Sequence, residues 1–559
     1  MEGTYSLKNA VKKLFHLINL EKNEIKGIYI YAFLNGVILL SLPLGIQAII
    51  NLMFGVTIST SLIVLISLVI IGVLVNGIFQ IKQMRMIERL QQRIFTRLTF
   101  GYAYRIPKIT LTSIDKYYLP ELVNRFFDTA SLQKGLSKLL LELPTATIQV
   151  FFGLILLGFY HPVFIIFGVL VFIMAVLIFY GSSTKAFESS INESDYKYKV
   201  ASWLEELSRS IKTFKVNQQT DLHLKRTDEL VTGYLDSRNT HFKVLLLQYR
   251  TIIAFKVIIT ATMLILGAFL FVNQIINLGQ FIATEIIIIT IINALEKLIV
   301  SLELVYDVLT SLEKANKVLE KPQDKETFLV NPENWTQQAG LSVSLKNLSF
   351  GYTDNDRILK NLNLSVSAGE KVCIKGLEGS GKSTLLNVLT CMWPNFEGQF
   401  QLNENPVRNI DASILHKEIA FYLKDDELFG ASILENITIG QSHFSFKELQ
   451  DVVDLVGLSD FISSRKNGFD TMIDPQGKKL SSNIAQKILL ARAIFKKPAL
   501  LLLDETWLTI DFESKNKIIE YLTANDNPHT LIAISNDENF ASKCNCIYFM
   551  ENGQLTQKN

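Results

Sequence analysis

Long apolar segments recur through the first 310 residues of the chain, and each reaches or approaches the ~20 residues that a helix needs to cross ~30 Å of hydrocarbon. None of these segments has a polar face, so buried helices of a soluble protein explain them less well. The pattern predicts six membrane-spanning helices. They cover residues 27–50, 61–80, 139–159, 163–180, 252–272 and 279–300.

Basic residues orient these predicted spans, because Lys and Arg concentrate at the cytoplasmic ends of membrane helices. Lysines precede the first span and arginines follow the second, whereas the connections after spans one, three and five contain neither. We therefore expect a multi-pass protein of the cytoplasmic (inner) membrane with both termini in the cytoplasm. The first apolar run is too long for a signal peptide. The inner segments 81–138 and 181–250 have helical patterns, so the helices should continue beyond the bilayer.

Composition supports a membrane protein and excludes other classes. Hydrophobic residues make up 49% of the chain and charged residues only 19%. The 55 Lys and Arg residues nearly balance the 53 Asp and Glu residues, so charge gives no reason to expect a nucleic-acid partner. The 4 cysteines are too few for a disulfide framework, and we interpret them as reduced. Cys544 and Cys546 lack the second Cys/His pair that a zinc site requires.

The chain becomes polar after the last predicted span. Pro322, Pro332 and several acidic residues mark 321–340 as a linker. We therefore divide the chain into a transmembrane domain (1–320), this linker and a soluble domain (341–559). The soluble domain has roughly 220 residues, which is enough for one α/β core.

A phosphate-binding loop stands near the start of the soluble domain. A predicted strand at 371–374 is followed by a glycine-rich loop and then by a predicted helix. In such a loop the backbone N–H groups converge on phosphate oxygens, the lysine reaches the β- and γ-phosphates, and the hydroxyl after it holds Mg²⁺. The predicted ATP-binding residues here are Gly376, Gly379, Ser380, Gly381, Lys382, Ser383 and Thr384.

Two carboxylates follow a second predicted strand, at 499–503. Asp504 at the end of that strand can complete the Mg²⁺ shell, and the adjacent Glu505 can orient or deprotonate an attacking water. An apolar strand that ends in Asp-Glu is a weak signal alone, but it is strong after a phosphate loop. We therefore predict that Lys382 and Glu505 are the catalytic residues of an ATPase.

With these motifs, the chain resembles the ABC transporters of the exporter type over nearly its whole length. The resemblance implies an all-α six-helix transmembrane domain followed by an α/β P-loop ATP-binding cassette domain, with ATP and Mg²⁺ as cofactors. It also implies that Tyr352, in the segment Phe350-Gly351-Tyr352, stacks on adenine, and that Asp511 faces a partner domain. A shorter match at 42–47 resembles the bacterial type I secretion exporters.

Three signatures of that family are altered in this chain. The LSGGQ signature appears as Leu480-Ser481-Ser482-Asn483-Ile484, so both glycines are lost, although Ser481 can still donate a hydrogen bond to ATP. Lys424 stands where the family has the Q-loop glutamine. Asn536 replaces the switch histidine; it can hydrogen-bond the γ-phosphate but carries no titrating proton. We therefore expect intact ATP binding and hydrolysis that is slow or depends on a partner.

Five charged residues lie inside the predicted spans, of which Glu142, Glu296 and Lys297 lie near cytoplasmic ends, where side chains reach the interface easily. Glu285 lies about eight residues past the outer turn, which places it ~12 Å deep. It is expected to face a cavity or another helix, and we treat it as a candidate for substrate contact or gating. Lys256 lies nearer the cytoplasmic end, and we expect it to extend to the membrane interface.

The leading hypothesis is an ATP-dependent exporter half that works as a homodimer or as a heterodimer with a second half-transporter, surrounded by membrane lipid. The resemblance favours protein or peptide substrates, with a periplasmic adaptor and an outer-membrane channel as further partners. Two alternatives remain at this point. One is an ATP-binding switch or regulatory membrane subunit with vestigial hydrolysis, and the other is a lipid flippase.

Overall fold

The computed structural model describes residues 6–53, 60–114, 119–160, 162–217, 219–324, 340–353, 356–424, 426–505 and 509–558, without the side chains of 39, 40 and most of 164–182. The chain divides into two compact units. The helical unit consists of Met1–Pro107 and Tyr117–Lys321, and the nucleotide unit consists of Lys108–Lys116 and Pro322–Asn559.

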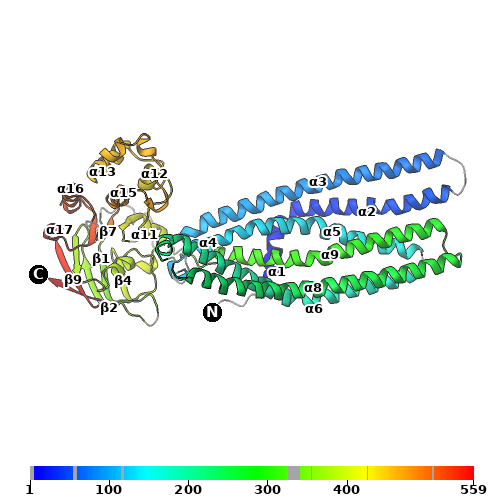
Figure 1. The fold of residues 1–559 in the computed structure, drawn as a ribbon. Coiled ribbons are helices and arrows are strands. Elements are labelled where there is room, and N and C mark those ends of the chain that lie inside the picture. The colour runs from blue at the N-terminus through cyan, green and yellow to red at the C-terminus, as the bar shows by residue number, and fades with distance from the viewer. Residues whose placement is uncertain are drawn as a thin grey trace. The chain divides into compact units, whose positions relative to one another are not determined.

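The helical unit is dominated by long helices (Figure 1). The longest, α8, has 51 residues and is therefore about 76 Å long, more than twice the thickness of a bilayer core. Every predicted span lies within a longer helix. The helices are α1 (Leu7–Leu20), α2 (Lys22–Met53), α3 (Thr60–Arg105), α4 (Leu119–Asn124), α5 (Asp128–Tyr160), α6 (Val163–Arg209), α7 (Ile211–Val216), α8 (Leu222–Val272) and α9 (Leu278–Leu319).

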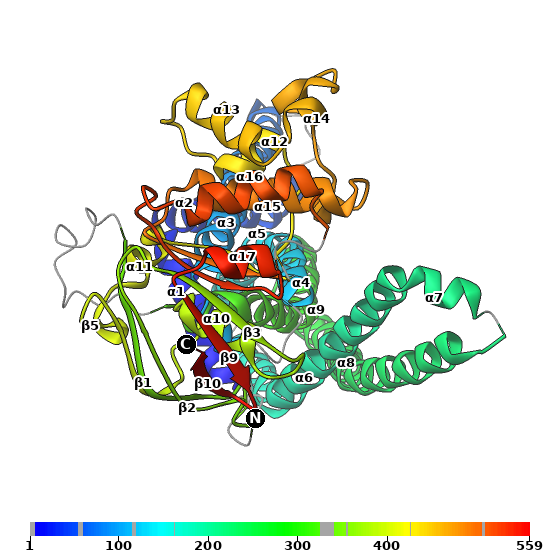
Figure 2. The same ribbon diagram turned by 90° about the vertical axis from the view of Figure 1, so that its left-hand side faces the viewer.

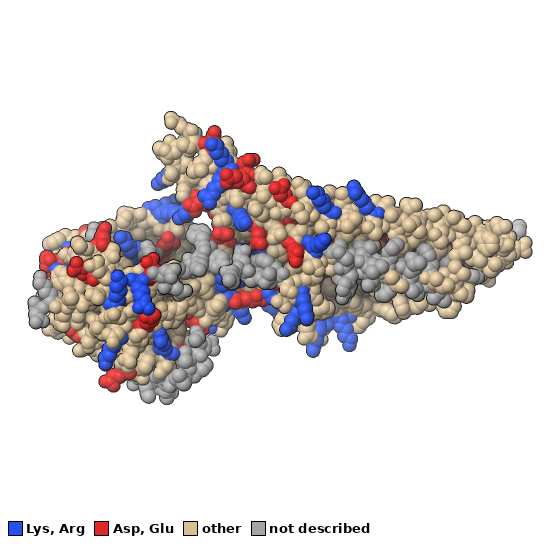
Figure 3. Space-filling model, turned by 90° about the horizontal axis from the view of Figure 1, so that it is seen from below, with Lys and Arg blue, Asp and Glu red and all other residues tan. Residues whose placement is uncertain are grey.

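Among the described residues, five helical segments are long and apolar enough to cross a membrane. They contain α2, α3, α5, α8 and α9. The predicted span at 163–180 lies on α6, but most of its side chains lie outside the described part. On the face shown in Figure 3, the end of this unit at the α8–α9 turn carries neither acidic nor basic side chains, as expected for a surface in contact with lipid.

Close helix contacts hold the unit together. Helix α5 packs along α9, and a side chain at Gly153 on α5 would collide with Ile291 Cγ1, 2.7 Å from the position of the missing Cβ. Helices α6 and α8 lie side by side and carry α7 at one end (Figure 2). Small residues permit such close packing in membranes, where the hydrophobic effect does not drive helices together.

The nucleotide unit contains two sheets. The antiparallel sheet has the order β2-β1-β4-β5, from β1 (Val343–Phe350), β2 (Leu359–Val366), β4 (Glu397–Leu402) and β5 (Asn405–Pro406). The second sheet has the order β10-β9-β3-β8-β7-β6 and is parallel except for β10. Its strands are β3 (Lys371–Gly376), β6 (Ile419–Tyr422), β7 (Leu500–Asp504), β8 (Thr530–Ile534), β9 (Cys546–Glu551) and β10 (Gln554–Lys558).

The parallel sheet lies in the core. Strands β7 and β8 are buried along their whole length, because their apolar side chains are covered on both faces. The two strands predicted from the sequence, 371–374 and 499–503, correspond to β3 and β7 with ends that differ by one or two residues. The helices of this unit are α10 (Lys382–Leu389), α11 (Ala412–Glu418), α12 (Ile433–Thr438), α13 (Phe446–Leu455), α14 (Ser459–Ser463), α15 (Ser482–Phe495), α16 (Phe512–Thr523) and α17 (Glu538–Lys543).

Candidate nucleotide-binding site

Three strands bring the predicted site together. Strands β3, β8 and β7 are neighbours and parallel, so the residues that follow them meet at one edge of the sheet. Ser535 N donates to Ile374 O at 3.2 Å, and Glu505 N donates to Ile534 O at 3.0 Å. The phosphate loop, the segment with Asn536 and the Asp504-Glu505 pair therefore lie along the carboxyl edge, where open α/β sheets bind ligands.

Glycines shape the phosphate loop. Gly379 and Gly381 have φ values of 77° and 101°, a backbone conformation that side chains disfavour. At Gly376 a Cβ would lie 2.3 Å from the carbonyl oxygen of Met550, so the close approach of β9 also requires glycine there. Gly381 is the N-cap of α10, whose first turn contains Lys382, Ser383 and Thr384. The N-terminus of α10 thus faces the loop, as phosphate binding requires.

Lys382 is folded over this loop. Its Nζ donates to Gly376 O at 2.9 Å and to Leu377 O at 2.7 Å, and the side chain is buried. Ser380 is also buried, and its Oγ has no hydrogen-bond partner among the described residues. A buried cation and an unsatisfied hydroxyl on a loop of this shape suit an anionic ligand with several oxygens.

Ser383 and Asp504, the two predicted metal ligands, lie within hydrogen-bonding reach of each other. Asp504 is buried, and burial raises the pKa of its carboxyl. A hydrogen bond with Ser383 and the charges of Lys424 and Lys382 oppose this rise. A hydroxyl and a carboxylate are hard oxygen donors of the kind that Mg²⁺ takes together with substrate phosphates. These two residues therefore fit the predicted metal site.

Glu505 has a strained backbone. Its φ is 46°, in the left-handed region, which is uncommon for residues other than glycine. The hydrogen bond of its N–H to Ile534 O holds this conformation. Strain of this kind concentrates at functional sites, where the surrounding structure maintains it. The conformation is consistent with the predicted role of Glu505 beside the metal ligand Asp504.

Tyr352 lies in an aromatic cluster that the sequence did not reveal. Its ring packs edge-to-face against Trp393, with centroids 4.9 Å apart, and against Phe350 at 5.2 Å. Its hydroxyl accepts a hydrogen bond from Asn387 Nδ2 at 3.0 Å. Because Asn387 belongs to α10, Tyr352 is fixed to the helix that follows the phosphate loop. No spacing in the sequence connects Trp393 or Asn387 with this tyrosine.

The three positions at which this chain departs from the ABC signatures, Lys424, Asn536 and the segment that begins at Ser481, differ in exposure and in contacts. Lys424 is exposed, yet its charge acts on the Asp504 carboxyl. A cation thus lies within electrostatic reach of the predicted metal ligand, where the family has a neutral amide. Asn536 is exposed in the segment after β8. Ser481 is the N-cap of α15, and its Oγ accepts the Ile484 N–H at 3.4 Å, which leaves the hydroxyl proton free to donate.

In the helical unit, Glu285 faces α8. Its Oε1 is buried without a hydrogen-bond partner among the described residues, and it lies 3.8 Å from the position that a Cβ on Gly267 would occupy. Glu285 thus packs against another helix, while its role in substrate contact or gating stays a prediction. Lys256 forms an ion pair with Glu296, with Nζ and Oε2 2.9 Å apart. This ion pair joins α8 to α9, and the extension of Lys256 to the membrane interface stays a prediction.

Comparison with known families accounts for both parts of the chain. Residues 27–295 match the ABC transporter transmembrane region, and residues 359–507 match the ABC transporter family. Together the two matches cover about three quarters of the chain and leave the linker between them. The chain belongs to the ABC transporter family.

Relatives of this ABC transporter include exporters. It is 28% identical over 359 residues to the alpha-hemolysin translocation ATP-binding protein HlyB of Escherichia coli O157:H7. The matched region covers 64% of this chain and 50% of HlyB. It is 29% identical over 295 residues to the leukotoxin export ATP-binding protein LtxB of Aggregatibacter actinomycetemcomitans, covering 52% of this chain and 41% of LtxB. The ABC transporter chain thus spans about half the length of these relatives.

The fold of the ABC transporter has a close structural counterpart. A bacterial Atm1-family ABC exporter, solved with ATP bound, superposes with a TM-score of 0.84 at 19% sequence identity. The match covers 96% of this chain and 94% of the other. At this identity the likeness establishes the fold: a helical transmembrane region followed by an α/β nucleotide-binding domain.

In this ABC transporter Asp511 makes strong contacts within its own unit. It is the N-cap of α16, where Oδ1 accepts the Ser514 N–H at 3.0 Å, and Oδ2 lies 2.5 Å from Lys487 Nζ. Partial burial opposes ionisation of Asp511, but the hydrogen bonds from Lys487 and Ser514 outweigh it and hold the pKa of the carboxyl below its usual range. These bonds hold Asp511 within its own unit, and its position opposite a partner domain stays a prediction.

Replacing Asp511 by alanine should destabilise the nucleotide unit by about 1 kcal/mol, because an N-cap is lost. The native pKa is lowered, so the contribution of Asp511 is complete above the ordinary Asp pKa of about 3.9 and is lost as the pH falls through the native value. Thermal unfolding of the two proteins at pH 7 should therefore differ by a few degrees, and the difference should shrink in acid. Glu513→Ala, at the exposed neighbouring position, is the control. An unchanged unfolding temperature would contradict the capping role.

Proposed function

We propose that this chain is one half of a dimeric, ATP-driven exporter of the cytoplasmic membrane, with both termini on the cytoplasmic side. The observation that carries the proposal is the convergence of Lys382, the Ser383–Asp504 pair and Glu505 at one edge of the parallel sheet. The basic residues beside the first two predicted spans support the orientation.

The residues have separate roles in the proposed reaction. The loop N–H groups and Lys382 bind the phosphates, and Tyr352 stacks on adenine. Ser383 and Asp504 would hold Mg²⁺, which when bound neutralises charge on the β- and γ-phosphates. Glu505 orients a water for attack on the γ-phosphorus and accepts its proton. Asn536 donates its amide to the γ-phosphate.

We propose that hydrolysis is slow in this chain. Signature glycines allow backbone N–H groups to approach the γ-phosphate that is bound on the opposite domain of a dimer. Ser482 and Asn483 add side chains at those positions, so Ser481 is the remaining donor. Lys424 brings a positive charge toward the metal site, and Asn536 does not titrate near neutral pH. In a homodimer, both ATP sites would have the same altered signature. In a heterodimer, the partner would supply its own signature to the site that contains Lys382 and Glu505.

We propose protein or peptide substrates, since HlyB is named for the translocation of alpha-hemolysin and LtxB for the export of leukotoxin. A periplasmic adaptor and an outer-membrane channel would complete such an export path. Membrane lipid surrounds the helices, and no nucleic acid takes part.

Removal of the metal tests the proposed chemistry. ATP hydrolysis by the purified chain in lipid should require Mg²⁺ and fall to background when EDTA is added, because the phosphate charge then lacks its counter-charge. Phosphate release is the measurement, and readdition of Mg²⁺ should restore the rate. Hydrolysis that continues in EDTA would exclude the Ser383 and Asp504 metal site.

A further inference from the structure

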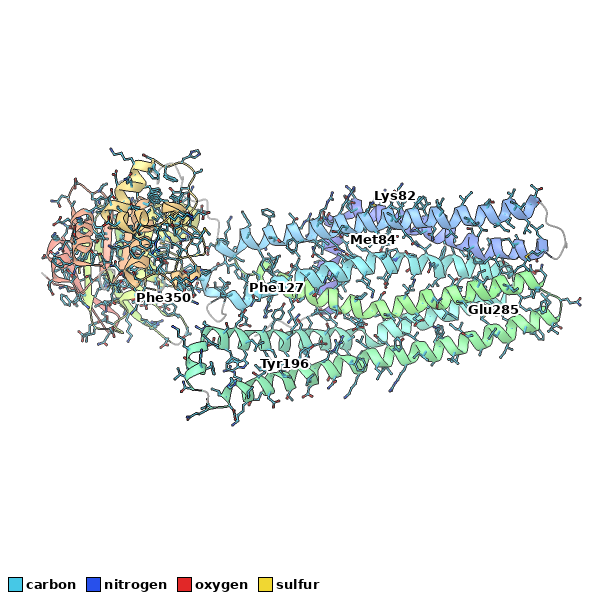
Figure 4. The ribbon with its side chains drawn as sticks, turned by 45° about the horizontal axis from the view of Figure 1, so that its top comes forward. Lys82, Met84, Phe127, Tyr196, Glu285 and Phe350 are labelled. Atoms are coloured by element: carbon cyan, nitrogen blue, oxygen red, sulfur yellow. The ribbon has the colours of Figure 1, made fainter. Side chains whose placement is uncertain are left out.

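A cavity of about 610 Å³ lies inside the helical unit, between α2, α3, α5 and α9. Its size falls within the ~300–1,000 Å³ range of small-ligand sites. Met84, labelled in Figure 4, lines this cavity on α3, whereas Glu285 lies farther along the bundle toward the α8–α9 turn. The polar side chains of its wall are Asn35, Gln80, Gln83, Glu142, Thr145, Gln149 and Lys297.

Most of the polar side chains on this wall are amides, and three of these amides are buried, where an unsatisfied polar group raises the free energy of the folded state. Asn35, Gln83 and Gln149 are 3%, 1% and 8% exposed, and Asn35 and Gln149 lie within predicted membrane spans. Asn35 Nδ2 donates to Gln83 Oε1 at 3.3 Å. Asn35 Oδ1 and Gln83 Nε2 have no partner among the described residues. An unpaired polar group within a membrane span, as at Asn35, is expensive and therefore indicates a function.

The wall matches one ligand chemistry best. A carboxamide offers both N–H donors and a carbonyl acceptor, as does each peptide unit of a main chain. A phosphate group instead favours clusters of Arg and Lys, but Lys297 is accompanied on this wall by the acidic Glu142. Glu142 also accepts a hydrogen bond from Ser301 at 3.3 Å, which orients its carboxylate.

We propose that this cavity binds a segment of peptide main chain in a largely sequence-independent way, through the amides of Asn35, Gln83 and Gln149. The proposal rests on the exporter function given above and identifies where this chain contacts its substrate.

Gly77 keeps the cavity open. A Cβ added at Gly77 meets nothing within 4 Å, so a larger side chain there would enter the cavity without a clash at its base. Gly72 lies on the same helix but faces elsewhere: its Cβ would make ordinary contact with Ser41 Oγ at 3.7 Å. The two glycines provide a matched pair for filling the cavity and for a control.

Binding of two defined peptides tests the proposal on the full-length chain in lipid nanodiscs. The first probe is an acetylated and amidated hexapeptide of alternating Ala and Ser, and the second is hexaproline with the same end groups. Proline has no backbone N–H, so it cannot donate to the amide oxygens. Calorimetric titration should detect the Ala-Ser peptide, while hexaproline should bind at least tenfold more weakly.

The variants then locate the site. Gly77→Leu should weaken binding of the Ala-Ser peptide tenfold or more, and Gln149→Leu should weaken it roughly fivefold, as expected for one lost hydrogen bond. Gly72→Ala should bind like the unmodified chain. ATP binding, measured in parallel, should be the same in all of these proteins, so a failure of this site is distinguished from a failure of the ATPase.

Three results would overturn the proposal. The first is no detectable peptide binding, and the second is equal binding of hexaproline. The third is a phospholipid that remains bound in native mass spectrometry, is lost in Gly77→Leu and resists displacement by the peptide, which would make the cavity a lipid site.

Discussion

Replacing Lys382 by alanine is expected to weaken ATP binding roughly ten- to hundredfold, the loss that accompanies removal of a charged hydrogen-bond donor. In the structure its ammonium lies on the phosphate loop, bonded to the carbonyls of Gly376 and Leu377, so it is poised over the position of the phosphates. Turnover should fall to background in the same variant. The measurement is equilibrium binding of a fluorescent ATP analogue, together with phosphate release.

Lys360→Ala is the control for this variant, because Lys360 is an exposed lysine of the same unit. It should bind ATP with unchanged affinity. If Lys382→Ala also bound ATP normally and retained its turnover, the phosphate loop would not be the site of catalysis, and the proposed function would fail.

Restoring the signature glycines is expected to accelerate hydrolysis. In the double variant Ser482→Gly/Asn483→Gly, backbone N–H groups regain access to a γ-phosphate, and donors of this kind are typically worth 10²–10³ in rate. Because Lys424 and Asn536 remain, we expect a gain of roughly tenfold in maximal turnover, with little change in ATP affinity. Asn483 Nδ2 donates to Asp511 Oδ2 at 3.5 Å. The double variant therefore also removes this hydrogen bond to Asp511.

The control for the double variant is Ala485→Gly, which places a glycine in the same helix and carries the same intrinsic cost of about 1 kcal/mol. It should leave turnover unchanged. Equal turnover in the unmodified chain and the double variant would show that the lost glycines do not limit the rate of hydrolysis. Lys424 and Asn536 would then be the altered residues that slow it.

Local patterns in the sequence predicted much of this molecule. Apolar runs of membrane length, an apolar strand before a glycine-rich loop, and an apolar strand before Asp504 are contiguous features, and the structure places each in the expected kind of element. The sequence also assigned Ser383 and Asp504 to one Mg²⁺ site, and parallel strands bring the carboxyl ends that precede them to one edge of the sheet. A hydrogen bond from Ser383 acts to lower the pKa of Asp504, which agrees with this arrangement, while the metal site itself stays a prediction.

Contacts between distant positions could not be predicted in this way. Trp393 and Asn387 reach Tyr352 because the antiparallel sheet folds against α10. The Lys256–Glu296 ion pair depends on the relative rotation of α8 and α9. The amides of the helical cavity come from separate helices, and each alone resembles an isolated polar residue in an apolar run. Such groupings depend on packing, which hydrophobic periodicity does not encode.

The rate of ATP hydrolysis by the purified chain in lipid, compared with that of its Glu505→Gln variant, shows whether this chain hydrolyses ATP with Glu505 as the base. We predict turnover that is measurable but below the ~10 s⁻¹ of a median enzyme, and its loss in Glu505→Gln while ATP still binds tightly. Glutamine preserves the shape of the side chain but accepts no proton at neutral pH. Tight ATP binding with no turnover in either protein, even with candidate partner chains present, would contradict the account and indicate a switch that uses ATP binding alone.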